Sequence, residues 1–243
     1  YVGVDGVARL VFSANSLPPK DTLENTSWAD IGKVAAAGKA AEYWAVGDTK
    51  TITFPSAVLG STSVSVEIIG FDHDDLADGS GKAPITFGMV DCFATKLAID
   101  SASSSAAGGW PAMPIRATLQ GSVYDAFPDD LKAVIKPVTK ISSNKSRGGG
   151  TMVSAADTLF LLAEIEIQGA ITYSWAGEGS RYARFATRTD RIKRIGTSTA
   201  YWHTRSPGHG TTSTDNWCRT QNDGVPGAAF VNMADGIACA FCV

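Results

Sequence analysis

Three histidines, His73, His203 and His209, could act as general bases near neutral pH. Serines and aspartates are common around them, but the chain contains neither a Gly-x-Ser-x-Gly nor a His-Glu-x-x-His pattern. The sequence therefore specifies no catalytic triad, and we expect no enzymatic activity. A hydrolase or oxidase remains an alternative, which a deep pocket joining one of these histidines to a carboxylate or thiol would favour.

Cys239 and Cys242 have the spacing of half a zinc site or of a redox pair. In a strand, alternation along "IACAFCV" places the two thiols on opposite faces. The chain offers no second Cys-x-x-Cys motif and no His pair to complete a site. We expect reduced, buried cysteines with a structural role, and we expect neither a metal nor another cofactor.

Two groups of acidic residues could have a chemical role, one in binding a cation and the other in proton transfer. Asp72, Asp74, Asp75 and Asp78 could hold Ca²⁺, but their loop lacks the glycine and glutamate offsets of an EF-hand, so a solvated acidic turn is the alternative. Glu164 and Glu166 are two positions apart, so they could share one face of a strand. Apolar neighbours favour structural carboxylates there over a glycosidase pair.

One basic cluster lies between Arg181 and Arg194, where five arginines and Lys193 are interleaved with aromatic residues. We expect a helix there that could bind phosphates or an acidic protein surface, although a solvated charged face is the simpler interpretation. The formal net charge of -3 gives no general attraction to nucleic acid or to an anionic membrane. No apolar run has the roughly 18 residues of a membrane span. We therefore expect neither nucleic-acid binding nor membrane insertion.

The 243 residues suffice for one sizeable domain and a small attachment module. Residues 1 to 13 have the alternation and the Asp-Gly turn of a β-hairpin, and a Pro-Pro linker follows. We place a boundary near residue 22, which gives an attachment segment over 1–22 and a main domain over 23–243.

The main domain mixes short strands with separated helices, which indicates an α+β fold. Ser27 is a suitable N-cap for a helix that ends at Gly38, and another helix is expected from about Ala112. We expect strands at "EYWAV", "TITF", "SVSVEIIGF", "ITFGMVDCF", "KPVTKIS" and within "DTLFLLAEIEI", and a short helix at "PDDLKAVI".

From Trp28 onward the chain resembles a bacterial and prophage domain family of unknown activity that is frequent in gut clostridia. The resemblance is carried, in order, by "SWADIGKV", "YWAVGD", "VEIIGFDHDD", "ITF", "GGWPAMPIR", "PDDLKAVIKPVTK", "DTLFLLAEIEI", "SRYARF" and "YWHTRSPG". We assign several of these blocks to the scaffold. Gly109 and Trp110 would position the second helix, Arg116 would pair with an internal carboxylate, and "RSP" at 205–207 would fix the start of the last segment.

The closing part also resembles the variable proteins of diversity-generating retroelements, which have a C-type-lectin fold and display diversified side chains. Their Trp-Leu-Arg-Ser-Pro block corresponds here to Trp202 and the residues 205–207, with His-Thr in place of Leu. The interval from Gly224 to Gly236 and the strand "IACAFCV" correspond to the diversified stretch and the closing strand. The resemblance implies a C-type-lectin-like fold with a display surface at about 201–236.

The composition of this interval agrees in part with diversification. Adenine-directed mutation of Asn codons ending in a pyrimidine yields Val, Gly, Ala, Phe or Asp, which are the residues at most positions of "VPGAAFVNMAD". Met233 cannot arise in this way. Either position 233 is not a target of the adenine-directed mutation, or this copy is not diversified by a retroelement.

We expect the display surface to bind a ligand through aromatic and arginine anchors, Trp217, Arg219 and Phe230, surrounded by small or polar neighbours. For Trp217 and Phe230 burial in a strand pair is the alternative, whereas Arg219 and Asp235 are expected to be exposed. The expected ligand-binding residues are His203, His209, Asp215, Trp217, Arg219, Gln221, Asn222, Phe230, Asn232, Met233 and Asp235.

These resemblances imply a structural protein of a phage or prophage virion, made in the bacterial cytoplasm, that binds a host-surface protein or glycan. The N-terminal segment would attach to other virion proteins, as comparable segments do in tail-associated proteins of clostridial phages. A homo-oligomer is expected, and a trimer by analogy with fibres. A capsid or tail decoration protein without a receptor role is one alternative, and an enzyme on a scaffold like that of the formylglycine-generating enzyme is another.

Overall fold

The computed structural model describes residues 16–102, 105–145, 150–208 and 216–243. These residues form short helices and several small antiparallel sheets, so the predicted α+β class is confirmed. The hairpin expected over residues 1 to 13 lies outside them. No helix in these ranges combines the length and the apolar character that a membrane crossing requires.

The helix α1 (Trp28–Ala36) begins where the sequence predicts. The Ser27 hydroxyl accepts a hydrogen bond from the Asp30 backbone N–H at 3.1 Å and thereby caps the first turn. Beyond the last turn, Gly38 has a φ of +66°, a conformation that favours glycine. The helix buries one face, made of Trp28, Ile31, Val34 and Ala35.

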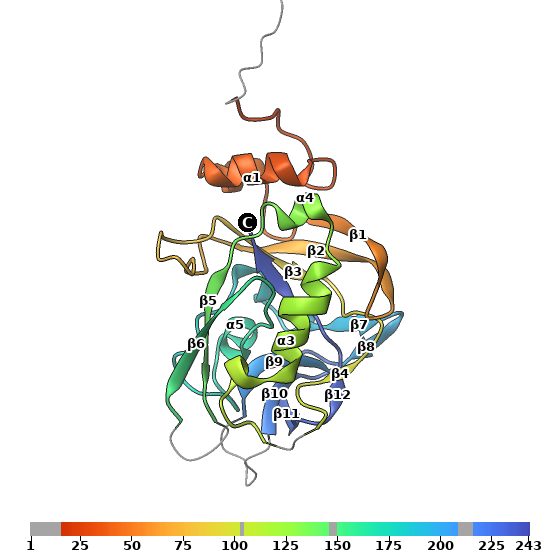
Figure 1. Ribbon diagram of the computed structural model, residues 1–243, viewed down its shortest axis with the longest axis vertical. Helices are drawn as coiled ribbons and strands as arrows, with labels where there is room; N and C mark the ends of the chain where they lie inside the picture. Colours follow the sequence, from red (N-terminus) through yellow and green to blue (C-terminus); the bar gives the residue numbers. More distant parts are fainter. Residues whose placement is uncertain (1–15, 103–104, 146–149, 209–215) are drawn as a thin grey trace, which may run out of the picture.

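The central sheet has four antiparallel strands in the order β1-β2-β3-β13. They are β1 (Thr49–Val58), β2 (Ser61–Phe71), β3 (Ile85–Met89) and β13 (Ala240–Cys242). The Trp28 ring of α1 lies edge-on against Phe87 and Phe241, with ring centroids 5.4 and 6.0 Å apart. The core thus joins α1 to the last strand, and Figure 1 shows the C-terminus beside α1.

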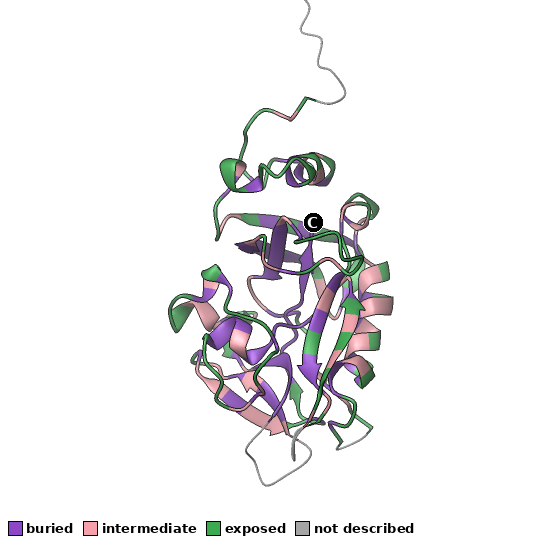
Figure 2. Ribbon diagram, turned by 90° about the vertical axis from the view of Figure 1, so that its left-hand side faces the viewer, coloured by how far each residue is buried: buried purple, intermediate pink, exposed green. Residues whose placement is uncertain are grey.

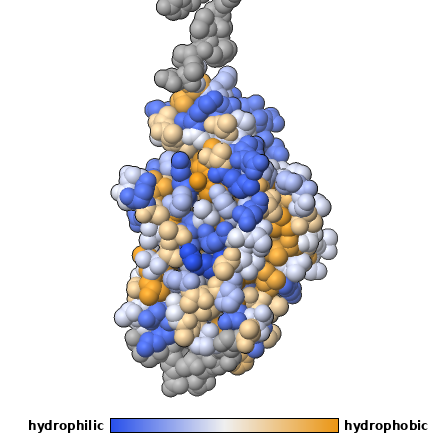
Figure 3. All heavy atoms as spheres, in the orientation of Figure 1, coloured by the Kyte–Doolittle hydropathy of each residue, from blue (hydrophilic) through white to orange (hydrophobic). Residues whose placement is uncertain are grey.

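The remaining elements surround this sheet. Three two-stranded sheets pair β5 (Val138–Ser143) with β6 (Met152–Asp157), β7 (Lys193–Ile195) with β8 (Ser198–Ala200), and β4 (Leu97–Ala98) with β12 (Ala234–Asp235). A three-stranded sheet places β10 (Asn216–Thr220) between β9 (Trp202–Pro207) and β11 (Pro226–Phe230). It lies at the end of the molecule opposite α1 (Figure 1). Figure 2 shows buried ribbon in the strands of the interior and exposed ribbon on α1, and the face drawn in Figure 3 mixes hydrophilic with apolar side chains.

The expected second helix exists as three consecutive turns: η1 (Trp110–Ala112), α3 (Pro114–Thr118) and the π-turn η2 (Leu119–Val123). Asp157, the last residue of β6, links η1 and α3 to this strand. Its Oδ1 accepts from Arg116 Nε at 2.7 Å, and its Oδ2 accepts from Trp110 Nε1 at 2.6 Å. The predicted internal carboxylate partner of Arg116 is therefore Asp157, and this prediction is confirmed. The short helix α4 (Asp129–Lys132) also lies where expected.

The strand expected at "EYWAV" is wrong, because residues 40–43 form the helix α2 (Ala40–Tyr43). Trp44, which follows it, is buried, and its indole N–H donates to the Asp21 carbonyl at 3.2 Å. The strand β1 instead pairs with β2. A tertiary contact of one aromatic side chain thus overrides a local strand propensity.

The strand expected within "DTLFLLAEIEI" is also wrong after Asp157, where β6 ends. The apolar run has only an isolated bridge from Phe160 to Ala240, and the helix α5 (Glu164–Gln168) follows it. The Glu166 carboxylate accepts from the Ala163 N–H at 2.8 Å at the start of α5. A short apolar run of this kind fits a strand and a buried helix equally well by periodicity.

The basic helix expected between Arg181 and Arg194 is wrong. This stretch forms two 3-10 turns, η3 (Ala183–Phe185) and η4 (Thr189–Arg191), and the strand β7. Arg184 pairs with Glu67 and with Asp190, at 2.5 and 2.9 Å. Lys193 is buried and donates to two backbone carbonyls. All of these partners except Asp190 come from distant parts of the chain, and they hold Arg184 and Lys193 away from a common helical face.

Candidate ligand-binding surface

The three-stranded sheet and the segment after it contain the residues that the sequence predicts to bind a ligand. Trp217, in the central strand β10, has 0 % exposure, and its indole N–H donates to the Thr204 carbonyl at 2.6 Å. Trp217 is thus packed inside the fold. Its expected role as an exposed anchor is corrected, because the central strand of this sheet is covered on the face that the ring occupies.

His203, in β9, is also buried, which corrects its expected exposure. Its Nε2 lies 3.0 Å from the Leu97 carbonyl and 3.2 Å from the Met233 carbonyl. Burial lowers the pKa of His203, although the charge of Asp235 opposes this shift. A neutral ring with its proton on Nε2 can donate to these carbonyls and so holds the backbone at Met233 in place.

Arg219 and Asp235 form an ion pair in which Nη1 and Oδ2 are 3.0 Å apart. Arg219 stands opposite His203 in the β9–β10 register, and its guanidinium lies 4.3 Å from the centroid of the Tyr201 ring. The Arg219 side chain is 20 % exposed and the Asp235 side chain only 6 %. The expected exposure of Asp235 is therefore wrong, since its carboxylate faces inward to Arg219. Three predicted residues, His203, Arg219 and Asp235, meet here beneath the surface.

The β11–β12 turn, residues 230–233, lies above this cluster and carries the exposed part of the predicted set. Phe230 is 52 % exposed and Met233 is 48 % exposed, and Asn232 between them is exposed as well. Val231 is fully buried. The turn therefore presents two large apolar side chains to solvent while one side chain anchors it in the core.

Backbone contacts hold the β11–β12 turn at several points. The Met233 N–H donates to the Phe230 carbonyl at 3.0 Å, and the Asp100 N–H donates to the Val231 carbonyl at 3.1 Å. On the far side, Ala234 pairs with Ala98 in the two-stranded sheet. Together with the contact from His203, these bonds fix the backbone, so the turn loses little backbone freedom on binding.

The other predicted residues lie around this turn or outside the described residues. Gln221 and Asn222 are partly exposed in the turn between β10 and β11. Gln221 donates from its amide to the Pro226 carbonyl at 3.0 Å. His209 and Asp215 are outside the described residues.

A buried network of charged residues was missed by sequence reasoning. Lys140 Nζ lies 2.6 Å from Asp74 Oδ1 and 2.9 Å from Glu166 Oε1, and Arg205 forms a two-nitrogen contact with the same Glu166. Tyr182 donates to Asp74 at 2.9 Å. The only signal in the sequence is that Lys140 and Glu166 stand inside apolar stretches, where an unpaired charge would be costly.

The structure bears on two possibilities that the sequence raises, an acidic loop that holds Ca²⁺ and a pair of glutamates on one face. Asp74 faces Lys140 inside the fold rather than sharing a loop site with Asp72, Asp75 and Asp78, and the described residues contain no group of three or more His, Cys, Asp or Glu that could hold a metal ion. Glu164 and Glu166 do not share a face. Glu164 instead accepts from the backbone N–H groups of residues 172–174.

Glu178 adjoins the network, whose two cations and two anions already balance each other, so an ionised Glu178 would have no opposite charge left to pair with. Burial raises the pKa of Glu178 to about 7, although the Ser206 hydroxyl, the Ser143 backbone N–H and Arg205 oppose the shift. A raised pKa contributes stability that is complete below the ordinary value of 4.5 and is lost as the pH rises through about 7.

Glu178→Gln is therefore expected to gain stability relative to the wild type between pH 5 and pH 8, by roughly 3 kcal/mol or less. The amide needs no proton to stay neutral, whereas the wild-type carboxyl must retain one in the folded state. Urea unfolding of both proteins at pH 5, 6, 7 and 8 measures the difference. A difference that stays constant over this range would contradict the assignment.

The cysteines have the structural role that the sequence predicts. All four are buried free thiols. Burial raises the pKa of Cys239 to about 12, and its thiol lies 3.6 Å from the Met89 sulfur. Cys242 contacts Asp74 and Thr86, each at 3.5 Å. Thiols of this kind remain protonated near neutral pH and are poor nucleophiles and metal ligands.

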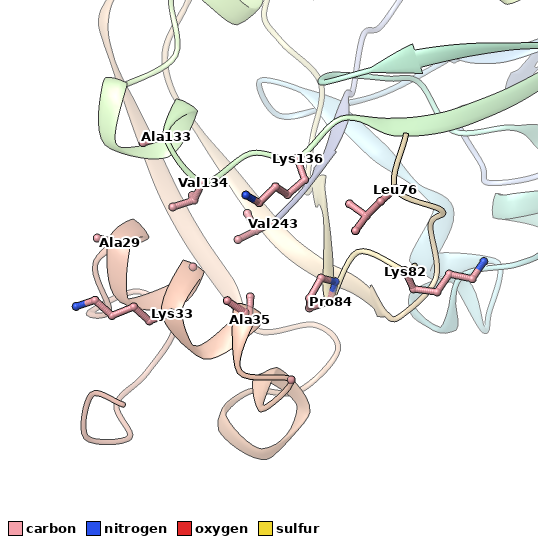
Figure 4. A pocket seen from close by; sticks show the side chains of 13 residues that line it. Ala29, Lys33, Ala35, Leu76, Lys82, Pro84, Ala133, Val134, Lys136 and Val243 are labelled. Carbon is pink, nitrogen blue, oxygen red and sulfur yellow. The ribbon is translucent and has the colours of Figure 1, made fainter. Parts of the chain in front are cut away.

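A groove of about 530 Å³ lies between α1, the segment after α4 and the last residue, Val243 (Figure 4). Its lining is mostly small and apolar, with three lysines around it. Lys33 and Lys82 are paired with Asp30 and Asp75, at 2.8 and 2.7 Å. Nothing in the structure indicates what would occupy this groove, so no function is assigned to it.

The fold and the turn define a mixed α+β protein whose candidate site is a fixed, partly apolar projection on its surface. Residues 93–243, more than half of the chain, match a family described as a domain of unknown function (DUF6273), and the chain belongs to this family. Comparison with curated proteins and comparison with solved structures each gave no match.

Proposed function

We propose that the protein binds a host-surface protein or glycan through the β11–β12 turn, as a structural component of a phage or prophage virion. We further propose that the domain has a C-type-lectin-like fold and that other virion proteins hold its N-terminal segment. The sequence resemblances described above support the virion context. The placement of Phe230, Asn232 and Met233 supports the binding surface.

The observation that carries this proposal is the exposure of two large apolar side chains on a fixed backbone. Phe230 and Met233 are each about half exposed, at 52 % and 48 %, although burial of the remaining half of either would stabilise the protein by about 1 kcal/mol. Exposed apolar side chains that lie close together are typical of interaction sites. An aromatic ring on a rigid turn is a suitable binding anchor because little entropy is lost on contact.

The double variant Phe230→Ser with Met233→Ser is expected to weaken binding at least about 30-fold while changing the free energy of unfolding by only about 0.5 kcal/mol. Both side chains already contact water, so their loss leaves the core intact. Binding is measured with labelled protein on intact gut clostridial cells and on a glycan panel, and stability by urea unfolding.

The matched control is Ile171→Ser, which removes an apolar side chain of 46 % exposure from the segment after α5. It is expected to leave binding unchanged. Equal binding by the double variant and the wild type would overturn the assignment of this surface. Binding to neither cells nor glycans, together with many copies over a virion shell, would favour the decoration role.

A further inference from the structure

Three side chains from two loops meet beside the buried charge network in an order that suits nucleophilic catalysis. Ser180 Oγ lies 3.3 Å from His73 Nε2, and His73 Nδ1 lies 3.7 Å from Asp74 Oδ1. Their burial is graded: Ser180 is exposed, the His73 side chain is 18 % exposed and the Asp74 side chain 3 %. The three side chains stand in the order of a Ser-His-Asp triad, and His73 Nδ1 is buried on the side of Asp74 without a hydrogen bond in this structure.

The carboxylate of this group is fixed and ionised. Asp74 accepts from Lys140 at 2.6 Å, from Thr86 at 2.6 Å and from Tyr182 at 2.9 Å. Burial alone would raise the pKa of Asp74, but the Lys140 ammonium and these hydrogen bonds hold it well below its usual value. A carboxylate in this state can orient a neighbouring imidazole without accepting its proton.

The imidazole is held by a ring contact and has two partners for Nε2. The His73 ring stacks on Tyr182 with ring centroids 3.9 Å apart. Nε2 lies 3.1 Å from the Ser180 carbonyl as well as 3.3 Å from its hydroxyl. With the proton on Nε2 the ring donates to the carbonyl; with the proton on Nδ1, facing Asp74, Nε2 can accept from the hydroxyl.

The space in front of Ser180 is small and polar. A hollow of about 140 Å³ is lined by all three side chains, and Lys82 and Asp75 stand among its more exposed lining residues. Lys82 Nζ donates to the His73 carbonyl at 3.1 Å and pairs with Asp75 at 2.7 Å. Gly179, directly before Ser180, has a φ of +135° and faces Glu166, so a side chain there would collide with that carboxylate. Glycine is therefore required directly before Ser180.

We propose that Ser180, His73 and Asp74 form a nucleophilic site that hydrolyses small acyl esters, with Ser180 as nucleophile, His73 as general base and Asp74 as a positioning residue. The size of the hollow favours a short acyl group such as acetyl. The site is separate from the β11–β12 turn and does not depend on the proposed binding function. It departs from the expectation that the protein is not an enzyme.

The chemistry requires no cofactor and uses water as the second reactant. Ser180 Oγ forms a bond to the acyl carbon while its proton passes to His73 Nε2, and the carbonyl electron pair moves to oxygen. The tetrahedral intermediate then collapses, which breaks the ester bond, and the leaving alcohol takes the proton from His73. Water then gives a proton to His73 while its oxygen forms a bond to the acyl carbon. The bond between this carbon and Ser180 Oγ breaks, His73 returns the proton to Oγ, and the acid is released.

The test combines ester hydrolysis with labelling of the serine. Purified wild-type protein is expected to hydrolyse p-nitrophenyl acetate and to form an adduct with a fluorophosphonate on Ser180, located by mass spectrometry. Ser180→Ala and His73→Asn are each expected to lower the hydrolysis rate by about 100-fold or more. The control Ser198→Ala removes an exposed serine of β8 and should leave both signals unchanged.

The positioning role of Asp74 is tested by a separate experiment. Asp74→Asn, in a preparation shown to be folded by circular dichroism, should lower kcat and leave KM unchanged, because Asp74 acts on the reaction through His73. Wild-type hydrolysis no faster than that of Ser180→Ala would overturn the proposal. Labelling of Ser180 at the wild-type rate in His73→Asn would also overturn it, since the serine would then react without the base.

Discussion

Replacing Arg205 with methionine is expected to lower the free energy of unfolding by about 3–5 kcal/mol. Arg205 is only 1 % exposed, and its guanidinium contacts the Glu166 carboxylate through two nitrogens. It also donates to the Ile141 carbonyl at 3.0 Å and to the Leu161 carbonyl at 3.1 Å. Methionine fills much of the same volume, so the loss comes from groups left without donors in a dry interior.

The matched control for Arg205 is Arg188→Met. Arg188 also pairs with a carboxylate, that of Asp223, but the two side chains are 56 % and 50 % exposed. Water can replace the lost contact, so we expect a change of about 1 kcal/mol or less. Urea unfolding of both variants at pH 7 gives the comparison. Equal losses would mean that the buried network contributes no more than a surface ion pair.

Arg205 also shows which part of the scaffold can be derived from sequence. The block "RSP" at 205–207 was assigned to the architecture, and the structure places all three residues in the interior. Arg116 was expected to need an internal carboxylate, and Asp157 is that partner. Local signals also located α1, because the Ser27 cap and Gly38 determine where a helix can begin and end.

The errors arise where distant residues decide local structure. The basic stretch before β7 has the composition of a surface helix, but Glu67 on β2 binds Arg184 and Met89 on β3 binds Lys193. Neither partner could be identified from the stretch itself. The same limit applies to His73 and Ser180, which are 107 positions apart in the chain and become neighbours only through the fold.

The sequence prediction divided the side chains of the candidate surface wrongly into exposed and buried ones, since Trp217 and Asp235 are buried. Phe230, the last residue of β11, is 52 % exposed, and Val231, the first residue after this strand, is 0 % exposed, so neighbouring positions have opposite environments. Trp217 could not be assigned in the same way, because both faces of its strand β10 are largely covered. Periodicity predicts which residues differ in burial, whereas the packing of neighbouring segments decides whether a face meets water.

The second large effect is expected for Gly109→Ala, which should lower the free energy of unfolding by about 3 kcal/mol or more. Gly109 has φ +61° and ψ -160°, a region that is essentially restricted to glycine. An added Cβ would also overlap the Ser143 carbonyl oxygen, which belongs to the backbone of β5 and cannot rotate away. The substitution would therefore push Trp110 away from its bond to Asp157.

The control for Gly109 is a glycine with a positive φ that has no atom near the position of an added Cβ. Gly38 has a φ of +66°, but an added Cβ would have no atom within 4 Å. Gly38→Ala is expected to cost about 1–2 kcal/mol, which is the backbone strain alone. The excess for Gly109→Ala then combines the strain of its glycine-restricted backbone conformation with the overlap between the new Cβ and β5. Equal costs would show that the close approach of Gly109 to β5 adds nothing to stability, and that the position of Trp110 depends on its bond to Asp157 instead.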